Sequence, residues 1–218
     1  MIEVRDLAFG YPRGGFTLFV NELKVAHGEG VAMVGPSGCG KTTLLHLLAG
    51  ILAPASGSVV VDGVEVSELG HEDRQDFRAL AVGLVFQEFE LLDYLDVLDN
   101  VLLPYRVSPA LTLDGVARQR AVELVEQVGL ADKKSSFPRQ LSQGERQRVA
   151  VCRSLVTRPK VLFGDEPTAN LDADNRDHVM DTLFRYLDEQ GAPLVVVTHD
   201  RELQGRFDTV AHVRALAS

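Results

Sequence analysis

Cysteine is scarce in this chain, since only Cys39 and Cys152 occur among 218 residues. Their separation matches no metal-ligand spacing, and two cysteines make a poor disulfide framework. The sequence therefore argues against a disulfide-stapled secreted fold and against a cysteine-rich metal site. A reducing cytosol is the compartment that we expect.

Long hydrophobic runs are also lacking. A membrane-spanning helix needs roughly 20 consecutive apolar residues, whereas the most apolar stretch, residues 44–55, is interrupted by His46 and Gly50. Residues 1–6 contain neither the basic segment nor the apolar core of a signal peptide. We therefore expect neither secretion nor a membrane span within this sequence.

Positive charge is in the minority, with 22 lysines and arginines against 31 acidic residues and a net charge of −9. Such a balance argues against a surface that coats nucleic acid, so no nucleic-acid partner is expected. The remaining composition, 45% hydrophobic and 24% charged, is typical of a folded protein. The length suits one domain with a sizeable core.

Apolar runs predict strands at residues 2–5, 16–20, 30–34, 58–63, 82–86, 161–163 and 194–197. The last two runs are continuously apolar, as expected of parallel strands that are covered on both faces. A helix over residues 171–190 lies between them and ends at Gly191, while residues 88–157 are mainly helical. This alternation predicts an α/β fold with a helical insert.

The segment from Gly35 to Thr42 reads GPSGCGKT and matches the pattern G-x-x-x-x-G-K-[ST]. Its glycines let the backbone curl so that N–H groups point at phosphate oxygens. The start of the following helix adds a positive end, Lys41 adds a full charge, and Thr42 offers a hydroxyl to Mg²⁺. A plain glycine turn is the alternative, which the strand before the loop and the helix after it disfavour.

Two adjacent carboxylates, Asp165 and Glu166, follow the apolar strand at residues 161–163. Ligands bind at such strand ends in open α/β sheets. Asp165 would hold the Mg²⁺ shell, and Glu166, on the opposite side of the strand, could polarise an attacking water. Acidic residues are common in strand-ending turns, so the pair is a weak signal alone and gains weight from the phosphate loop.

Residues 141–145 read LSQGE and begin a further helical stretch. Ser142 would be a good helix N-cap, and the helix start a second anion site. For Ser142 alone, a plain cap is the simpler interpretation. The arginines at positions 146, 148 and 153 are interpreted as a solvated helix face without a catalytic role.

Taken in order, these motifs resemble the ATP-binding-cassette (ABC) nucleotide-binding domain over essentially the whole chain. The features that carry the resemblance are Tyr11, residues 35–42, Gln87, residues 141–145, Asp165-Glu166, residues 169–172 and His199. Gln143 replaces the commonest glycine, Glu145 the commonest glutamine, and Gly164 a more usual alanine. None of these departures removes a group that the chemistry requires.

The resemblance implies a phosphate-loop NTPase core with an antiparallel β subdomain and a helical insert subdomain. A single domain would span residues 1–218, with residues 1–87 and 158–218 forming the core and its β subdomain. Residues 88–157 would form the helical subdomain that carries the LSQGE motif.

The resemblance also implies ATP and Mg²⁺ as cofactors and assigns residues to them. The residues implied in ATP binding are Tyr11, which stacks on adenine, and Gly35, Pro36, Ser37, Gly38, Cys39, Gly40, Lys41, Thr42 and Thr43. The residues implied in metal binding are Thr42, Gln87 and Asp165, and those in catalysis are Glu166, His199 and Gln87. Ser142 and Gly144 would contact the γ-phosphate of ATP held by a second subunit, and Asp172 lies in the loop that crosses the interface.

A complete site then exists only between two copies of the chain, and ATP would close this homodimer while hydrolysis opens it. Because the opening and closing of the dimer can do mechanical work only on another protein, integral membrane permease subunits are the expected partners. The expected location is peripheral, on the cytoplasmic face of the inner membrane.

Residues 86–92, 100–104 and 166–172 resemble the lipoprotein-release and macrolide-export branch, to which the cell-division branch that controls wall hydrolases is close. The chain ends soon after His199, which leaves no room for the regulatory domain of many importers, so export or extraction is expected. A soluble non-transport ABC ATPase and a binding switch without turnover are the alternatives. The presence of both Glu166 and His199 disfavours the switch.

The two cysteines are expected to differ in reactivity. Cys39 lies among groups of the phosphate loop that favour a reactive thiolate, and a packed, slow-reacting side chain is the alternative. Cys152 shares an apolar helical stripe with Val149 and Val156, which predicts burial and inertness.

Overall fold

The computed structural model describes residues 1–12, 14 and 16–213. Its strands are β1 (Ile2–Gly10), β2 (Thr17–Val25), β3 (Gly30–Val34), β4 (Ser56–Val61), β5 (Val64–Glu65), β6 (Val82–Val85), β7 (Val161–Asp165), β8 (Leu194–Val197) and β9 (Thr209–His212). Its α-helices are α1 (Lys41–Leu48), α2 (His71–Ala81), α3 (Val97–Val101), α4 (Leu103–Val107), α5 (Gly115–Gln127), α6 (Gln143–Leu155), α7 (Ala173–Gln190) and α8 (Arg201–Gln204).

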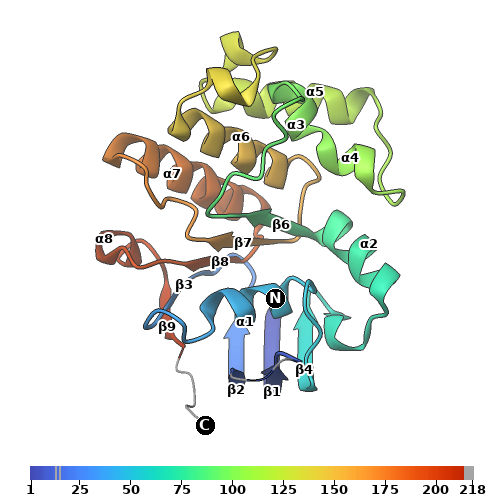
Figure 1. The fold of residues 1–218 in the computed structure, drawn as a ribbon, viewed down its shortest axis with the longest axis vertical. Coiled ribbons are helices and arrows are strands. Elements are labelled where there is room, and N and C mark those ends of the chain that lie inside the picture. Colours follow the sequence, from blue (N-terminus) through green and yellow to red (C-terminus); the bar gives the residue numbers. More distant parts are fainter. Residues whose placement is uncertain (13, 15, 214–218) are drawn as a thin grey trace.

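The strands form two sheets. One is antiparallel with the order β2-β1-β4-β5, and the other is parallel with the order β6-β7-β8-β3-β9. Helix α1 lies between the two sheets, whereas α6 and α7 lie on the opposite side of the parallel sheet (Figure 1). Helices α3, α4 and α5 lie beyond α6 in the same view. The α/β class predicted from sequence, with its β subdomain and helical insert, is confirmed.

Both faces of the parallel sheet are buried, and this explains the continuous apolar runs of its strands. Along β3, Val31 and Met33 face the core around α1, while Ala32 and Val34 face the core under α6 and α7. Strand β8 alternates in the same way. Each residue of these strands therefore leaves water on folding, whichever way its side chain points.

Several local signals are confirmed at the predicted positions. Asp62 and Gly63 both have positive φ, as a two-residue hairpin turn between β4 and β5 requires. Helix α7 ends at Gly191, which is left-handed. Strands β1 and β2 run longer than predicted, because they pair along their whole length although one face carries charged residues. Helix α2 was not predicted; Phe77 is its one buried residue, so its apolar stripe is narrow.

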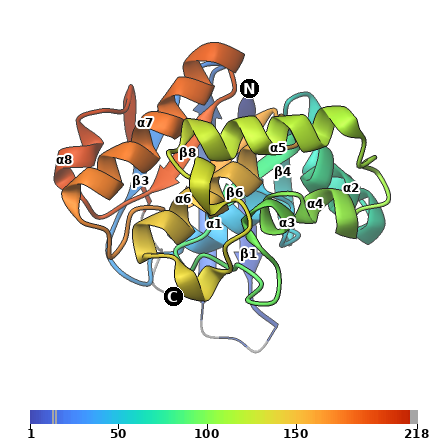
Figure 2. The ribbon, with the colours of Figure 1, turned by 90° about the horizontal axis from the view of Figure 1, so that it is seen from above.

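No helix within residues 1–12, 14 and 16–213 is both long enough and apolar enough to cross a membrane. The three central strands of the parallel sheet, β7, β8 and β3, are direct neighbours and point the same way. Their carboxyl ends therefore meet at one edge of the sheet, where α1 begins (Figures 1 and 2). Loops that are far apart in the sequence are brought together at this edge.

Candidate functional site

The loop between β3 and α1 wraps around the ammonium group of Lys41. Its Nζ donates to the carbonyl oxygens of Gly35 and Pro36, each at 3.0 Å, and the residue is only 6% exposed. Gly40 precedes the helix with φ 99°, and a Cβ there would lie 2.6 Å from the Phe16 ring. A side chain at position 40 would thus be strained and would clash, so this turn requires glycine.

A pocket of about 260 Å³ opens over this loop. It is lined by Tyr11, Phe16, Ser37, Gly38, Gly40, Lys41, Thr42, Thr43, Glu166 and His199. The structure therefore brings together most of the residues that the sequence assigns to ATP binding and catalysis. Phe16 was missed, because nothing in the sequence distinguishes it from an ordinary strand residue.

The aromatic wall of the pocket is held by contacts on two sides. The Tyr11 hydroxyl lies 3.3 Å from Thr43 Oγ1 at the start of α1. Its ring meets Phe9 edge to face at 4.9 Å between centroids. Tyr11 is still 43% exposed, so a broad aromatic surface faces the mouth of the pocket. Such a surface can stack on a flat heterocycle without reading its edges.

Two oxygen-bearing side chains from different elements, Thr42 in the pocket lining and Asp165 at the end of β7, meet beside the pocket. Thr42 Oγ1 donates to Asp165 Oδ1 at 3.0 Å, although the residues are separated by 123 positions. A hydroxyl and a carboxylate are hard oxygen donors of the type that Mg²⁺ prefers, and this ion retains several waters in such sites. Thr42 and Asp165 therefore fit a magnesium ion.

Glu166 and His199 form the reactive edge of the pocket. Glu166 Oε1 lies 3.2 Å from His199 Nε2, and the two residues follow the neighbouring strands β7 and β8. Glu166 has φ 48°, a left-handed conformation that costs about 1–3 kcal/mol for a residue other than glycine. The backbone hydrogen bonds from Glu166 to Val197 and from Ala169 to Glu166 help to hold this turn.

Gln147 is a second residue that the sequence did not single out. It is 1% exposed in α6, and its Nε2 donates to the carbonyl oxygen of Pro167 at 2.5 Å. Its Oε1 is buried and has no hydrogen-bond partner among the described residues. A buried amide of α6 thus holds the carbonyl group of Pro167, the residue that follows Glu166.

Five residues predicted for the nucleotide or metal site do not line the pocket, among them Asp165, which bonds to the lining residue Thr42. Gln87 is exposed in the bend after β6. Gly35 and Pro36 contribute carbonyl oxygens to Lys41, and Cys39 is turned into the core. Their assignment to nucleotide or metal binding stays a prediction.

Ser142, Gly144 and Asp172 lie together at the neighbouring starts of α6 and α7, outside the pocket. Ser142 caps α6: its Oγ accepts from the N–H of Glu145, and Glu145 Oε2 accepts from the N–H of Ser142. Asp172 caps α7, and hydrogen bonds from Asn175 lower its pKa. The Asn175 side chain fills the space beside Gly144, which leaves no room for a Cβ there.

The interpretation of the three arginines of α6 as a solvated face is wrong. Arg146 donates to the carbonyl oxygens of Pro138 and Leu141, and Arg148 donates to Asn175. Arg153 donates to the carbonyl oxygens of Phe89 and Glu90, and burial lowers its pKa. Long arginine side chains reach loop carbonyls here, which spacing along one helix cannot reveal.

For Cys39, burial favours the alternative of a packed side chain over a reactive thiolate. The residue is 5% exposed, and its sulfur would lie 2.7 Å from a Cβ placed on Gly35. The thiol therefore packs behind the loop and does not face its anion-binding side. The prediction for Cys152 is confirmed, because it is fully buried and this burial raises its pKa to about 12.

A second and larger cavity, about 830 Å³ in volume, lies between α2 and α4. Figure 2 shows these two helices side by side at one end of the molecule. Its apolar wall includes Leu84, Phe86 and Val107, and the acidic residues Glu72 and Asp76 lie on the α2 side. Arg153 also lines it, so the cavity borders the segment that follows Gln87.

Comparisons with known proteins agree with this geometry. Residues 20–169 match the protein family described as ABC transporter. The chain is 40% identical over 217 residues to the lipoprotein-releasing system ATP-binding protein LolD 1 of Rhodopirellula baltica, which covers 96% of this chain and 94% of that protein. LolD of Bordetella pertussis is 46% identical over 191 residues, covering 88% and 82%. The dimeric ATP-binding cassette MJ0796, solved in a post-hydrolysis state with ADP and Pi, matches with a TM-score of 0.87 at 30% identity and covers 98% of this chain and 94% of that one.

Proposed function

Because this chain belongs to the ABC transporter family and is an ATPase of that family, we propose that it drives a membrane complex that extracts or exports lipoproteins. The observation that carries this function is the convergence of a phosphate loop and the Glu166–His199 pair in one pocket, whose lining residue Thr42 bonds to Asp165. ATP and Mg²⁺ are the ligands that these groups suit.

In this pocket, positioning and charge neutralisation account for phosphoryl transfer to water. Lys41 and the N–H groups of the loop would hold the phosphates, and Tyr11 would stack on adenine. Mg²⁺, held by Thr42 and Asp165, would neutralise charge on the phosphate oxygens. Glu166 would orient the attacking water and accept its proton. His199, at 3.2 Å from Glu166, would keep that carboxylate in place.

A second copy of the chain would complete the site. Ser142 and Asp172 lie outside the pocket, at two adjacent helix starts, and the positive end of the α6 dipole favours an anion beside Ser142. We propose that they face the ATP bound by the other copy. The dimeric state of the MJ0796 cassette, which matches this chain over nearly its whole length, supports this arrangement.

The cavity between α2 and α4 is the proposed docking site for a cytoplasmic helix of the membrane subunit. Its wall is largely apolar, and Val107 at its rim is 70% exposed. Arg153 links this wall to the carbonyl oxygens of Phe89 and Glu90, so a docked helix would contact the segment that follows Gln87. The chain would then lie peripherally on the cytoplasmic face of the membrane.

Glu166→Gln tests the assignment of the reaction. The amide keeps the shape of the side chain but cannot accept a proton, so turnover should fall roughly 10²- to 10⁴-fold while ATP binding survives. The variant should therefore accumulate as an ATP-bound dimer on gel filtration with Mg²⁺. Lys41→Ala is the control, because it should lose ATP binding and form no such dimer. Near wild-type phosphate release by Glu166→Gln would refute the role of Glu166.

The cargo is tested by reconstitution with the membrane subunits of the proposed complex, isolated by co-purification with this chain. Proteoliposomes that contain the whole complex and a fluorescent lipoprotein should release the lipoprotein to an acceptor on addition of Mg-ATP. Proteoliposomes made with Glu166→Gln provide the control. ATP-dependent turnover without any release would exclude lipoproteins as the cargo and leave the ATPase assignment intact.

A further inference from the structure

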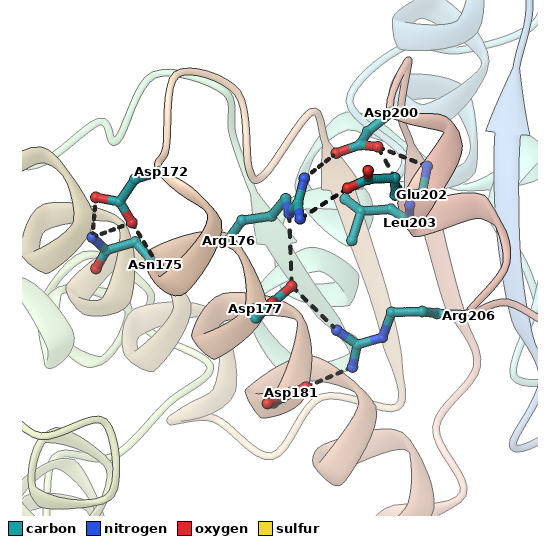
Figure 3. Close-up of polar contacts among 9 residues, drawn as sticks. All are labelled: Asp172, Asn175, Arg176, Asp177, Asp181, Asp200, Glu202, Leu203 and Arg206. Atoms are coloured by element: carbon teal, nitrogen blue, oxygen red, sulfur yellow. Dashed lines mark hydrogen bonds and ion pairs between the residues drawn. The ribbon is translucent and has the colours of Figure 1, made fainter.

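A network of ion pairs joins α7 to the segment that follows His199, outside the nucleotide pocket (Figure 3). Arg176 is its centre: Nη1 lies 3.0 Å from Asp200 Oδ2, and Nη2 lies 3.1 Å from Glu202 Oε2. Arg206 belongs to the same network: its Nη2 lies 2.6 Å from Asp181 Oδ1, and it shares Asp177 with Arg176 at longer distances, 4.0 Å from Arg206 Nη1 and 3.6 Å from Arg176 Nε. Two arginines thus tie the same two segments together at different points.

Asp200 fixes the backbone on the C-terminal side of His199. Its Oδ1 accepts from the N–H groups of Glu202 at 2.8 Å and Leu203 at 3.4 Å, which caps α8. Its own N–H donates to Thr198 Oγ1 at 3.0 Å. The turn formed by these bonds encloses His199, whose ring is half exposed and lies against Glu166. The direction of the imidazole therefore depends on where Asp200 is held.

Arg176 holds the remaining oxygen of Asp200 from the first turns of α7. That helix starts immediately after Asp172, its N-cap, and Arg176 follows one turn later. Asn175, next to Arg176, packs against Gly144 at the start of α6. The same helix end therefore contacts both the proposed dimer face and the residue that follows His199.

We propose that Arg176 is a positioning residue that, through Asp200, keeps His199 against Glu166 and ties this pair to the start of α7. The proposal rests on the proposed function of Glu166 and His199. A change in the position of the α7 start would move Asp200, and with it the imidazole. Arg176 itself does not line the pocket and acts on it only through Asp200 in this proposal.

If Arg176 only linked α7 to the segment after His199, its loss should affect activity no more than the loss of Arg206. Ion pairs near the surface contribute little to folding, and the Arg206–Asp181 pair joins the same helix to the same segment without contacting Asp200. Arg206→Gln is therefore the matched control for Arg176→Gln. If tethering of the segment were all that mattered, both variants would behave alike.

The experiment measures kcat for phosphate release, the Kd for Mg-ATP and the thermal midpoint of each purified variant. Arg176→Gln should lower kcat roughly 5- to 30-fold, as loss of precise positioning does, with Kd within about 2-fold of wild type. Asp200→Asn should do the same, because asparagine still caps α8 but carries no charge for Arg176. Arg176→Lys keeps the charge and should restore part of kcat, whereas Arg206→Gln should leave kcat unchanged.

The double variant Arg176→Gln/Asp200→Asn should be no slower than either single variant, because both act through one pair. Three results would each overturn the positioning role. They are a double variant in which the kcat losses of the two single variants multiply, an unchanged kcat in Arg176→Gln, and an equal loss of kcat in Arg206→Gln. His199→Ala separates this failure from that of the proposed function. A slow His199→Ala with a normal Arg176→Gln refutes only the positioning role, whereas a fully active His199→Ala refutes the assignment of His199 and the positioning role with it.

Discussion

Replacing Gln147 with leucine should separate stability from activity in this protein. The Gln147 amide is buried and donates to the carbonyl oxygen of Pro167, the residue after Glu166. Leucine has a similar volume and cannot donate, so the substitution leaves that carbonyl without this partner. It also removes the buried Oε1, which has no partner among the described residues.

The expected magnitudes follow from these two opposing changes. A buried polar group left unpaired costs about 1–3 kcal/mol. The variant creates one such group at Pro167 and removes another at Gln147, so the free energy of unfolding should change by less than about 1.5 kcal/mol. The effect on turnover is not offset in this way, because only the lost bond to Pro167 acts on Glu166. Glu166 is held in a left-handed conformation, and relaxation worth about 1–2 kcal/mol would slow hydrolysis roughly 5- to 30-fold.

Urea unfolding and phosphate release measured on the same preparation check this prediction, with ATP binding as the control for an intact pocket. Gln147→Glu provides the contrast, because a charged carboxylate in this buried position should destabilise the fold strongly. Gln147→Leu with full turnover would refute the view that the amide holds Glu166. A decrease of more than about 3 kcal/mol in the free energy of unfolding would refute the argument that removal of the unpaired Gln147 Oε1 offsets the unpaired carbonyl of Pro167.

Three further predictions follow from the structure. Ser142→Arg should leave ATP bound to the chain's own phosphate loop but prevent the ATP-dependent dimer, and normal dimerisation on gel filtration would contradict the shared site. Native protein should react slowly with a maleimide at both Cys39 and Cys152, because both thiols are buried; peptide mapping that finds fast labelling of Cys39 would contradict the packed loop. Asn100→Leu should lower the free energy of unfolding by roughly 2–4 kcal/mol, because the buried amide bonds to the backbone of Leu92, Leu95 and Asp96. An unchanged urea midpoint would show that these bonds do not stabilise the fold.

The phosphate loop was predictable because everything that defines it lies within one short segment. Residues 30–48 contain the strand, the glycines and the helix start, and each is recognisable from composition and periodicity. The same holds for α7, whose start at Asp172 and end at Gly191 follow local capping chemistry. Such signals need no knowledge of distant residues.

The side chains that hold the site together were predictable only in part. The family motifs indicated Glu166 and His199, but Gln147 and Arg176 gave no signal of their own. Their partners, Pro167 and Asp200, lie on other elements. Helical periodicity identifies the apolar face of a helix, but it does not reveal which distant group a polar side chain of that helix contacts. The roles of the buried Gln147 and of Arg176 therefore could not be read from the sequence.

The sequence by itself determined the α/β class, the phosphate loop and the end of α7 at Gly191, because short-range propensity and the periods of strand and helix specify them. Only the tertiary structure decided the order β6-β7-β8-β3-β9, which places Asp165 beside Thr42 and His199 beside Glu166. It also decided that Cys39 packs inward and that Arg153 binds loop carbonyls. Strand pairing and side-chain burial depend on which remote segments meet, and that is a property of the whole chain.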